Sequence, residues 1–238
     1  MNEHTVKAFS EQLEALSSSI AQMGGLAEAQ FAAAVDGVAR RDTVLAENAV
    51  GGDSQIDALQ LDVEDRAMKL LALRQPLAVD LRETLAAIKI ASELERIGDL
   101  AKNIAKRAIV LNREPPIRLT TSLARMGKQA LSQLKQVLDA YSDRNAEAAE
   151  AVWKQDGEID ETYNSLFREL LTYMMEDPRT IGSSTHLLFI AKNIERCGDH
   201  ATNIAEVVYH MVRADHLSAN RPKADTTSST AIHFEDKA

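Results

Sequence analysis

The sequence predicts an all-α protein, built as a tandem duplication of a three-helix bundle with six long antiparallel helices. The 238 residues include only 10 glycines and 5 prolines. That is about half the roughly 12% of average proteins and leaves few turns for a sandwich or barrel. Apolar residues make up 45% of the chain, enough to build a core and to exclude global disorder. One eleven-residue motif also occurs twice, which indicates an internal repeat.

The prolines separate the predicted helices, because a proline inside a helix costs about 3 kcal/mol. None of them interrupts a stretch of helical apolar periodicity. The short connectors make consecutive helices antiparallel neighbours. The glycine pairs Gly24-Gly25 and Gly51-Gly52 are the positions where a helix can kink, since each internal glycine costs about 1 kcal/mol. The expected helices span residues 4–39, 42–72, 78–111, 118–141, 143–176 and 183–213.

Three segments follow from this reading. Residues 1–115 form the first three-helix repeat and residues 116–213 form the second. Residues 214–238 carry Ser, Thr, Asn, Asp and Pro without helical periodicity. We expect them to be a disordered C-terminal tail.

The composition argues against several classes of protein. A net charge of −9 disfavours nucleic-acid binding, which requires a basic surface. The chain has no apolar run near the roughly 20 residues needed to cross a bilayer, and it has no secretory signal. The single cysteine, Cys197, excludes an internal disulfide and a multi-cysteine zinc site. We therefore expect a cytoplasmic protein.

The repeated motif lies in the third and sixth predicted helices. It reads ERIGDLAKNIA at residues 95–105 and ERCGDHATNIA at residues 195–205, with eight of eleven positions identical. A weaker repeat lies upstream at an offset of 103, where DSQID at residues 53–57 corresponds to DGEID at residues 156–160. Arg41 and Arg144 share that offset.

Helical geometry separates the motif residues into two faces. At 100° per residue, one face is apolar and forms a core seam. The seam consists of Ile90, Leu94, Ile97, Ala101, Ile104 and Ala108 in the first copy and Ile190, Ile194, Cys197, Ala201, Ile204 and Val208 in the second. On the opposite face, carboxylates and an asparagine stack one turn apart. Glycine beside this face, at Gly98 and Gly198, would let a neighbouring helix approach closely.

Carboxylates at i and i+4 repel each other by a few tenths of a kcal/mol, and a hard cation would offset that repulsion. The neighbouring helix of each repeat adds a second such pair, so each repeat presents four carboxylates. Carboxylate and amide oxygens suit Mg²⁺, Ca²⁺, Mn²⁺ or iron, whereas no His or Cys cluster favours Zn²⁺. Acidic stripes that face solvent or a partner, and a catalytic role, remain alternatives. The candidate metal ligands are Asp53, Asp57, Glu95, Asp99, Asn103, Asp156, Asp160, Glu195, Asp199 and Asn203.

These duplicated motifs make the chain, over about residues 5–213, resemble the PhoU family of bacterial phosphate-specific transport system accessory proteins. The resemblance implies a cytoplasmic homodimer that represses the phosphate-starvation response. It would link the ATPase subunit of a high-affinity phosphate ABC transporter to a sensor histidine kinase, meet the membrane only through these partners, and not be an enzyme. It also implies that the acidic motifs bind metal ions, whose identity (Mg, Mn, Ca, Fe or Zn) stays open. Departures at Gly51-Gly52 and Gly157 loosen the helices near the motifs.

Two other readings compete with this expectation. A di-metal carboxylate enzyme in a helical bundle typically uses Glu-x-x-His on two helices, and the sequence contains no such motif. A metal-independent helical adaptor would use the same acidic stripes only for solubility.

Overall fold

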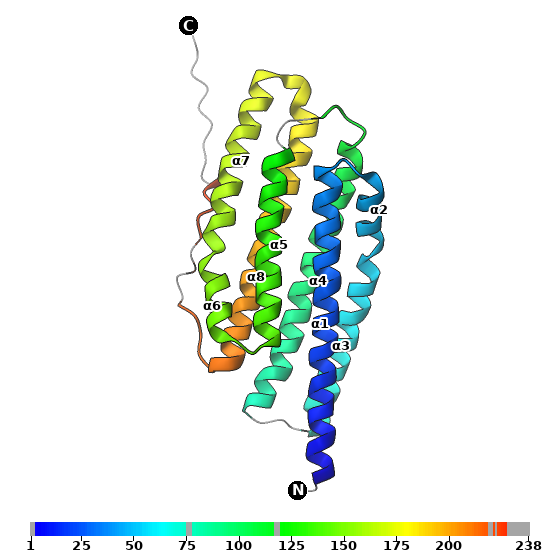
Figure 1. Cartoon of the computed structure of the whole chain (residues 1–238), viewed down its shortest axis with the longest axis vertical. Helices are drawn as coiled ribbons and strands as arrows, with labels where there is room; N and C mark the ends of the chain where they lie inside the picture. Colours follow the sequence, from blue (N-terminus) through cyan, green and yellow to red (C-terminus); the bar gives the residue numbers. More distant parts are fainter. Residues whose placement is uncertain (1–2, 75–77, 117–119, 219–220, 222, 228–238) are drawn as a thin grey trace.

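The computed structural model describes residues 3–74, 78–116, 120–218, 221 and 223–227, and every element in this part is helical (Figure 1). The predicted all-α class is confirmed. The predicted start of the fourth helix at residue 118, the connector at residues 75–77 and the tail from residue 228 lie outside the described residues. The elements are α1 (Glu3–Ala39), α2 (Thr43–Gly51), α3 (Asp53–Arg74), α4 (Val79–Leu111), α5 (Thr120–Ser142), α6 (Ala146–Lys154), α7 (Asp156–Glu176), the 3₁₀ turn η1 (Pro178–Thr180) and α8 (Ile181–Arg213).

The second and fifth predicted helices are each divided in two. The first break falls at Gly52, where the sequence allows a kink, and the second falls at Gln155. In both repeats an aspartate, Asp53 or Asp156, is the first residue of the new helix. The division is therefore a shared feature of the two repeats. By contrast, α1 continues through Gly24 and Gly25 without a break.

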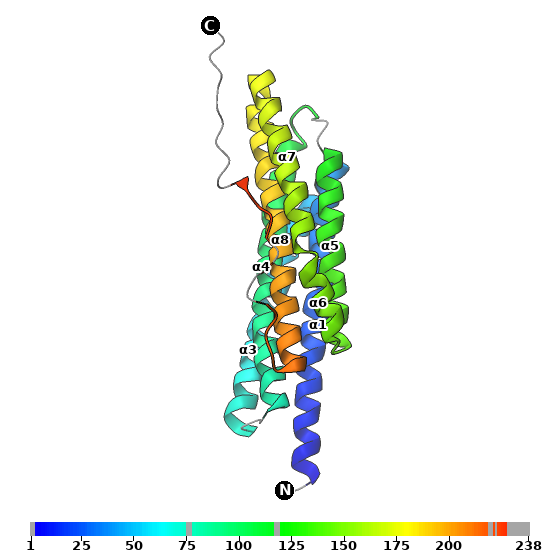
Figure 2. The ribbon, with the colours of Figure 1, turned by 90° about the vertical axis from the view of Figure 1, so that its left-hand side faces the viewer.

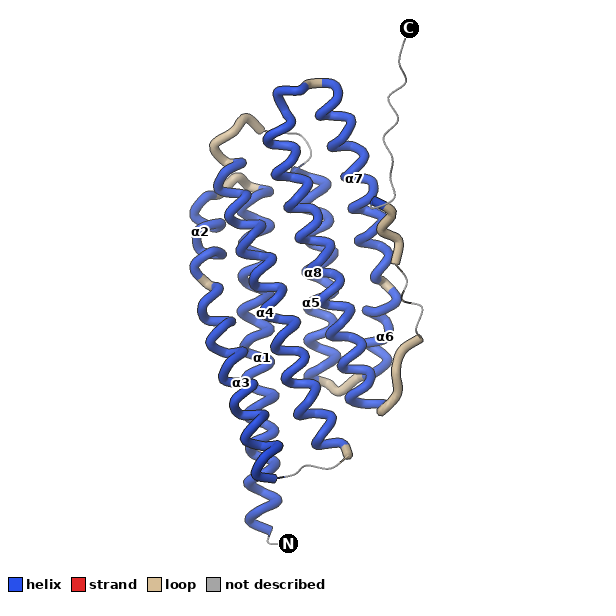
Figure 3. The backbone as a smooth tube through the Cα atoms, turned by 180° about the vertical axis from the view of Figure 1, so that it is seen from behind, coloured by secondary structure: helices blue, strands red, loops and turns tan. Residues whose placement is uncertain are grey.

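The helices run along the long axis of an elongated body (Figures 1 and 2). The two motif helices, α4 and α8, pack against each other at its centre, and Figure 3 shows them side by side. Helices α1, α2 and α3 pack on α4, while α5, α6 and α7 pack on α8. Both predicted seams are buried in one continuous core, and burial raises the pKa of the Cys197 thiol. In the described part of the chain, no helix is both long and apolar enough to cross a membrane.

Helices α1 and α5 meet through two reciprocal contacts. A Cβ added at Gly127 of α5 would lie 2.5 Å from Val35 Cγ1 of α1. One added at Gly24 of α1 would lie 2.7 Å from Leu138 Cδ2 of α5. Both glycines, and both of their partners, are separated by 103 positions. The repeats therefore pack on each other by a local two-fold relation, as identical subunits do in an isologous dimer.

Candidate functional site

The structure brings the predicted carboxylates together in two groups, one per repeat. The first acidic cluster comprises Asp53, Asp57, Glu95 and Asp99, on α3 and α4. The second acidic cluster comprises Asp156, Asp160, Glu195 and Asp199, on α7 and α8. In each, an aspartate stands at a helix start, where the partial positive charge of the helix N-terminus favours a carboxylate.

Close helix contacts hold these groups in place. A Cβ at Gly98 would lie 3.0 Å from Ile56 Cδ1, and one at Gly198 would lie 2.7 Å from Ile159 Cδ1. Each isoleucine lies between the two aspartates of its own motif. The predicted close approach at the motif glycines is therefore confirmed, and it presses each aspartate-bearing turn against the motif helix.

Two buried glutamines, which the sequence analysis missed, donate hydrogen bonds to backbone carbonyls near the two helix breaks. Gln30 Nε2 on α1 donates to the carbonyl of Ala49 at 2.8 Å. Gln133 Nε2 on α5 donates to the carbonyl of Gln155 at 3.1 Å. The first carbonyl lies three residues before the break at Gly52, and the second belongs to Gln155, the residue at which the other break falls. The two glutamines also share the offset of 103, which is the signal that could have identified them.

A lysine bridges the first acidic cluster. Lys102, on α4, forms ion pairs with Asp53 and, at 3.3 Å, with Asp99. Burial and then the neighbouring Asp53 charge raise the pKa of Asp57, and burial and then Asp99 raise that of Glu95. The four carboxylates therefore act on one another electrostatically. The fifth predicted ligand of this repeat, Asn103, is exposed.

The second acidic cluster lies deeper in the protein. Asp156, Asp160 and Glu195 are each 4% exposed. Burial is the main cause that raises the pKa of Asp160, and it raises that of Glu195 to about 7. Glu195 Oε1 accepts from Lys192 at 2.9 Å, whereas the buried Oε2 has no hydrogen-bond partner among the described residues. The second cluster thus holds an unsatisfied carboxylate oxygen.

An arginine from beyond the last helix fills the second acidic cluster. The guanidinium of Arg221 donates to both carboxylate oxygens of Asp156, at 2.7 and 2.8 Å, and to Asp199 Oδ1 at 2.7 Å. It also donates to Asn203 Oδ1 at 2.9 Å. Thr202, which replaces Lys102 in the second repeat, donates its hydroxyl to Asp156 Oδ1 at 2.9 Å.

The segment after Arg221 continues along α7. The backbone amides of Ala224 and Asp225 donate to Asp160 Oδ2 at 2.8 and 3.1 Å. Residues 221 and 223–227 therefore have specific partners where the sequence predicts a disordered tail. Polar contacts hold this segment in place. Apolar periodicity does not detect such contacts, so the sequence pattern alone predicts disorder.

The two repeats also meet through a polar contact that the sequence analysis missed. His200 Nδ1 lies 2.6 Å from Glu93 Oε2, and Asn203 Nδ2 donates to the same oxygen at 3.0 Å. Burial raises the pKa of Glu93, but the hydrogen bonds from His200 and Asn203 outweigh it and lower the pKa below its usual value. The sequence gives His200 no partner, because Glu93 belongs to the other repeat.

The carboxylate and amide oxygens of both clusters are ligands that suit a hard cation. Glu195 Oε2, which has no hydrogen-bond partner among the described residues, is available as one such ligand. Their present arrangement does not form a cage, however. In the described residues, no three His, Cys, Asp or Glu side chains are placed so that they could hold one metal ion. Lys102 and Arg221 lie between the carboxylates instead.

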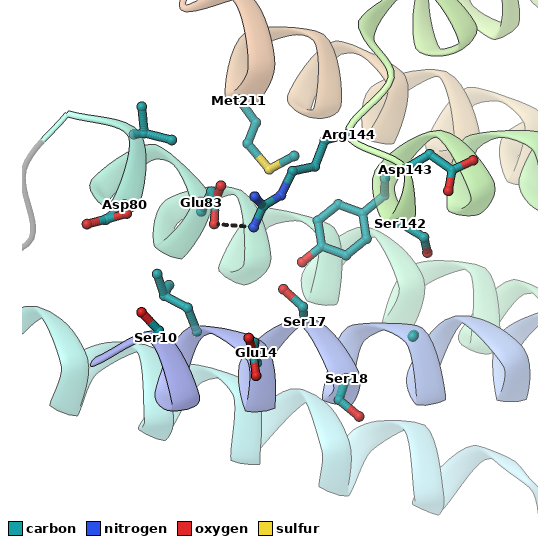
Figure 4. Close-up of a pocket in the computed structure, with 14 residues that line it drawn as sticks. Ser10, Glu14, Ser17, Ser18, Asp80, Glu83, Ser142, Asp143, Arg144 and Met211 are labelled. Carbon is teal, nitrogen blue, oxygen red and sulfur yellow. Dashed lines mark hydrogen bonds and ion pairs between the residues drawn. The ribbon is translucent and has the colours of Figure 1, made fainter. Parts of the chain in front are cut away.

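A separate cleft of about 790 Å³ lies where α1, α4 and α8 meet the connection between α5 and α6 (Figure 4). Serine hydroxyls and carboxylates line most of it, and Arg144 forms an ion pair with Glu83 at 3.0 Å. Arg144 has φ 50°, and its repeat counterpart Arg41 has φ 55°. The two arginines thus share a left-handed turn that precedes α2 in one repeat and α6 in the other.

Together, the fold and the clusters define an all-helical protein of two fused, equivalent bundles, each with one buried or half-buried acidic cluster. The family model described as "PhoU domain" matches residues 20–108 and 123–208, one segment in each predicted repeat. The chain belongs to the PhoU family.

Relatives match over nearly their whole length. The chain is 53% identical to the phosphate-specific transport system accessory protein PhoU homolog of Caulobacter vibrioides (strain NA1000 / CB15N), over 96% of this chain and 100% of the relative. It is 48% identical to the homolog of the same description in Rhizobium meliloti (strain 1021), over 95% and 96%.

Two solved structures share the fold. The crystal structure of PhoU from Pseudomonas aeruginosa superposes with a TM-score of 0.85 at 38% identity, over 87% of this chain and 100% of that chain. The phosphate transport system regulatory protein PhoU from Streptococcus pneumoniae gives a TM-score of 0.81 at 30% identity, over 88% and 99%.

Proposed function

We propose that this protein is an accessory regulator of phosphate transport that keeps the phosphate-starvation response off when phosphate is plentiful. The observation that carries the proposal is the near full-length similarity to relatives described as phosphate-specific transport system accessory proteins. The similar Streptococcus pneumoniae protein is described as regulatory. The role is non-enzymatic: the protein acts by binding other proteins.

The partners that we propose are the ATPase subunit of a phosphate ABC transporter and a sensor histidine kinase. Helix α3 offers a surface for such contacts, since Leu61, Met68 and Leu73 are 66%, 59% and 76% exposed. Exposed apolar side chains on a helix can serve as anchors in helix-mediated recognition. The net charge of −9 disfavours direct binding to anionic lipid or nucleic acid. We propose that the protein works in the cytoplasm as a homodimer and reaches the membrane through its partners.

A genetic experiment tests the regulatory role. Deleting the gene should turn on a phosphate-responsive alkaline phosphatase reporter in phosphate-rich medium, and only while the sensor kinase is present. Complementation with the wild-type chain should silence the reporter. A chain with Leu61→Ser, Met68→Ser and Leu73→Ser should fail to silence it although it folds normally by circular dichroism. A reporter that stays silent in the deletion strain, with kinase and transporter intact, rejects the role.

We also propose that the two acidic clusters bind divalent or iron-type cations. Carboxylate-rich donor sets support this proposal, because hard cations prefer oxygen ligands. Substituting Glu95→Gln and Asp99→Asn should abolish binding at the first cluster and leave the second intact, and Glu195→Gln with Asp199→Asn should do the reverse. Elemental analysis and Mn²⁺ titration count the ions. An unchanged ion count in either double variant would reject this assignment of ligands.

A further inference from the structure

We propose that the second acidic cluster is a docking site for the chain's own C-terminal segment, and that this segment and a bound cation exclude each other there. The segment, named here the strap, comprises Arg221 and residues 223–227. The docking of the strap is supported by its contacts with the second acidic cluster. Only the exclusion of a cation rests on the metal binding proposed above.

Arg221 contacts both helices of the second acidic cluster. Its side chain is 17% exposed, and its donors reach Asp156, Asp199 and Asn203, which come from both helices of the cluster. A guanidinium that pairs with both oxygens of one carboxylate is a strong and geometrically specific contact. Arg221 therefore bridges the two helices that form the site.

Side chains of α7 also bind the backbone of the strap. The buried amide of Asn164 donates to the carbonyl of Ala224 at 2.7 Å and accepts from the amide of Thr226 at 3.2 Å. Asp160 accepts from two consecutive backbone amides of the strap. Lys192 binds Asp225 at 2.8 Å while it also holds Glu195. Buried partners along several residues set a register, which a nonspecific attraction between charges does not do.

The cations that bridge the aspartates come from different parts of the chain in the two repeats. In the first repeat, Lys102 supplies the cation that bridges the aspartates. Its counterpart in the second repeat is Thr202, which is neutral and reaches only Asp156. Among the described residues, the second repeat thus has no lysine of its own between its aspartates, and the strap supplies Arg221, which is 65 positions away from Asp156. The two clusters are chemically similar but differ in what neutralises them.

Exclusion follows from the oxygens that Arg221 occupies. Both oxygens of Asp156 and one of Asp199 accept from it. A metal ion that used these ligands would have to displace the guanidinium. At a coordination distance of about 2.0–2.6 Å the ion would lie against guanidinium nitrogens bound to the same oxygens, and the two positive charges would repel each other strongly. Cation binding at the second cluster should therefore release the strap, whereas binding at the first cluster should leave it docked.

Trypsin measures docking without any metal. The Lys223–Ala224 peptide bond lies inside the strap, and its own N–H donates to Asp160. The Arg221–Pro222 bond resists trypsin because proline follows the arginine. With EDTA present, Arg221→Ala in the full-length chain should speed cleavage after Lys223 by about tenfold or more, because each lost charged hydrogen bond costs about one order of magnitude in the docking equilibrium. The control Arg125→Ala, at an exposed site on α5, should cleave at the wild-type rate. Equal cleavage rates for wild type and Arg221→Ala would overturn docking. Docking within one chain would also be overturned if the protection of the Lys223–Ala224 bond disappeared on dilution, because the strap would then bind a second copy.

Adding Mn²⁺ tests whether a bound cation and the strap exclude each other at the second cluster. Adding Mn²⁺ to the wild-type chain should speed cleavage after Lys223, and the effect should persist when the first cluster carries Glu95→Gln and Asp99→Asn. Arg221→Ala should tighten Mn²⁺ binding at one site only. If Mn²⁺ binds at the second cluster but the cleavage rate stays constant, exclusion is refuted. If no Mn²⁺ binds to any variant, the proposed metal binding fails together with exclusion, and the EDTA comparison alone decides docking.

Discussion

The contact between the two repeats can be tested at Gly127. A methyl group there would lie 2.5 Å from Val35 Cγ1 and 2.8 Å from Cγ2, whereas carbon atoms pack at about 3.5–4.0 Å. Valine is branched at Cβ and its side chain has one strongly preferred rotamer in a helix. Gly127→Ala therefore forces α1 and α5 apart by about 1 Å.

The net effect is the difference between two terms. Replacing an internal helical glycine with alanine gains about 1 kcal/mol of helix propensity. Overpacking a core costs about 1–3 kcal/mol, and the rigid partner places this site in the upper part of that range. We expect Gly127→Ala to lower the free energy of unfolding by about 1–2 kcal/mol, and to lower Tm by about 2–8 °C for a chain of this size.

Neighbouring glycines provide matched controls. Gly25 is exposed and has no atom within 4 Å of its added Cβ, so Gly25→Ala should raise Tm by about 2–4 °C. Gly24→Ala meets the end of the flexible Leu138 side chain and should fall between the two. Thermal unfolding followed by circular dichroism measures all three variants. A Gly127→Ala chain as stable as wild type would refute the close approach of α1 and α5.

Two further predictions concern Glu195 in the second acidic cluster and Asp42 at the start of α2. Burial raises the pKa of Glu195 from 4.5 to about 7, so the native state keeps a proton that the unfolded state has lost, and stability falls as pH rises across this range. In EDTA, the free energy of unfolding of Glu195→Gln should therefore match that of wild type below pH 4 and exceed it by up to about 3 kcal/mol above pH 7. Urea unfolding measures this difference, and a difference that does not change with pH would contradict the reasoning. Asp42 caps α2 by accepting from the amides of Val44 and Leu45, so Asp42→Ala should cost about 1 kcal/mol in the same assay, whereas Asp42→Asn should cost much less.

Local sequence patterns were sufficient to predict the helices and the duplication. The seam around Ile97 is buried because residues three and four apart share a helix face. The break at Gly52 follows from the weakness of glycine in a helix. The break at Gln155 was harder to foresee, since that residue is a good helix former and only its position in the repeat relates it to Gly52.

The sequence by itself determined which carboxylates belong together, because the repeat assigns Asp53 and Asp57 to the same unit as Glu95 and Asp99. Only the tertiary structure decided what lies between the carboxylates. Arg221 is separated from Asp156 by 65 positions, and Glu93 from His200 by 107. Such contacts depend on how distant segments are brought together, and hydrophobic periodicity carries no information about them. The motifs differ in sequence at Lys102 and Thr202, but only folding brings Arg221 to the second cluster and makes the two sites different.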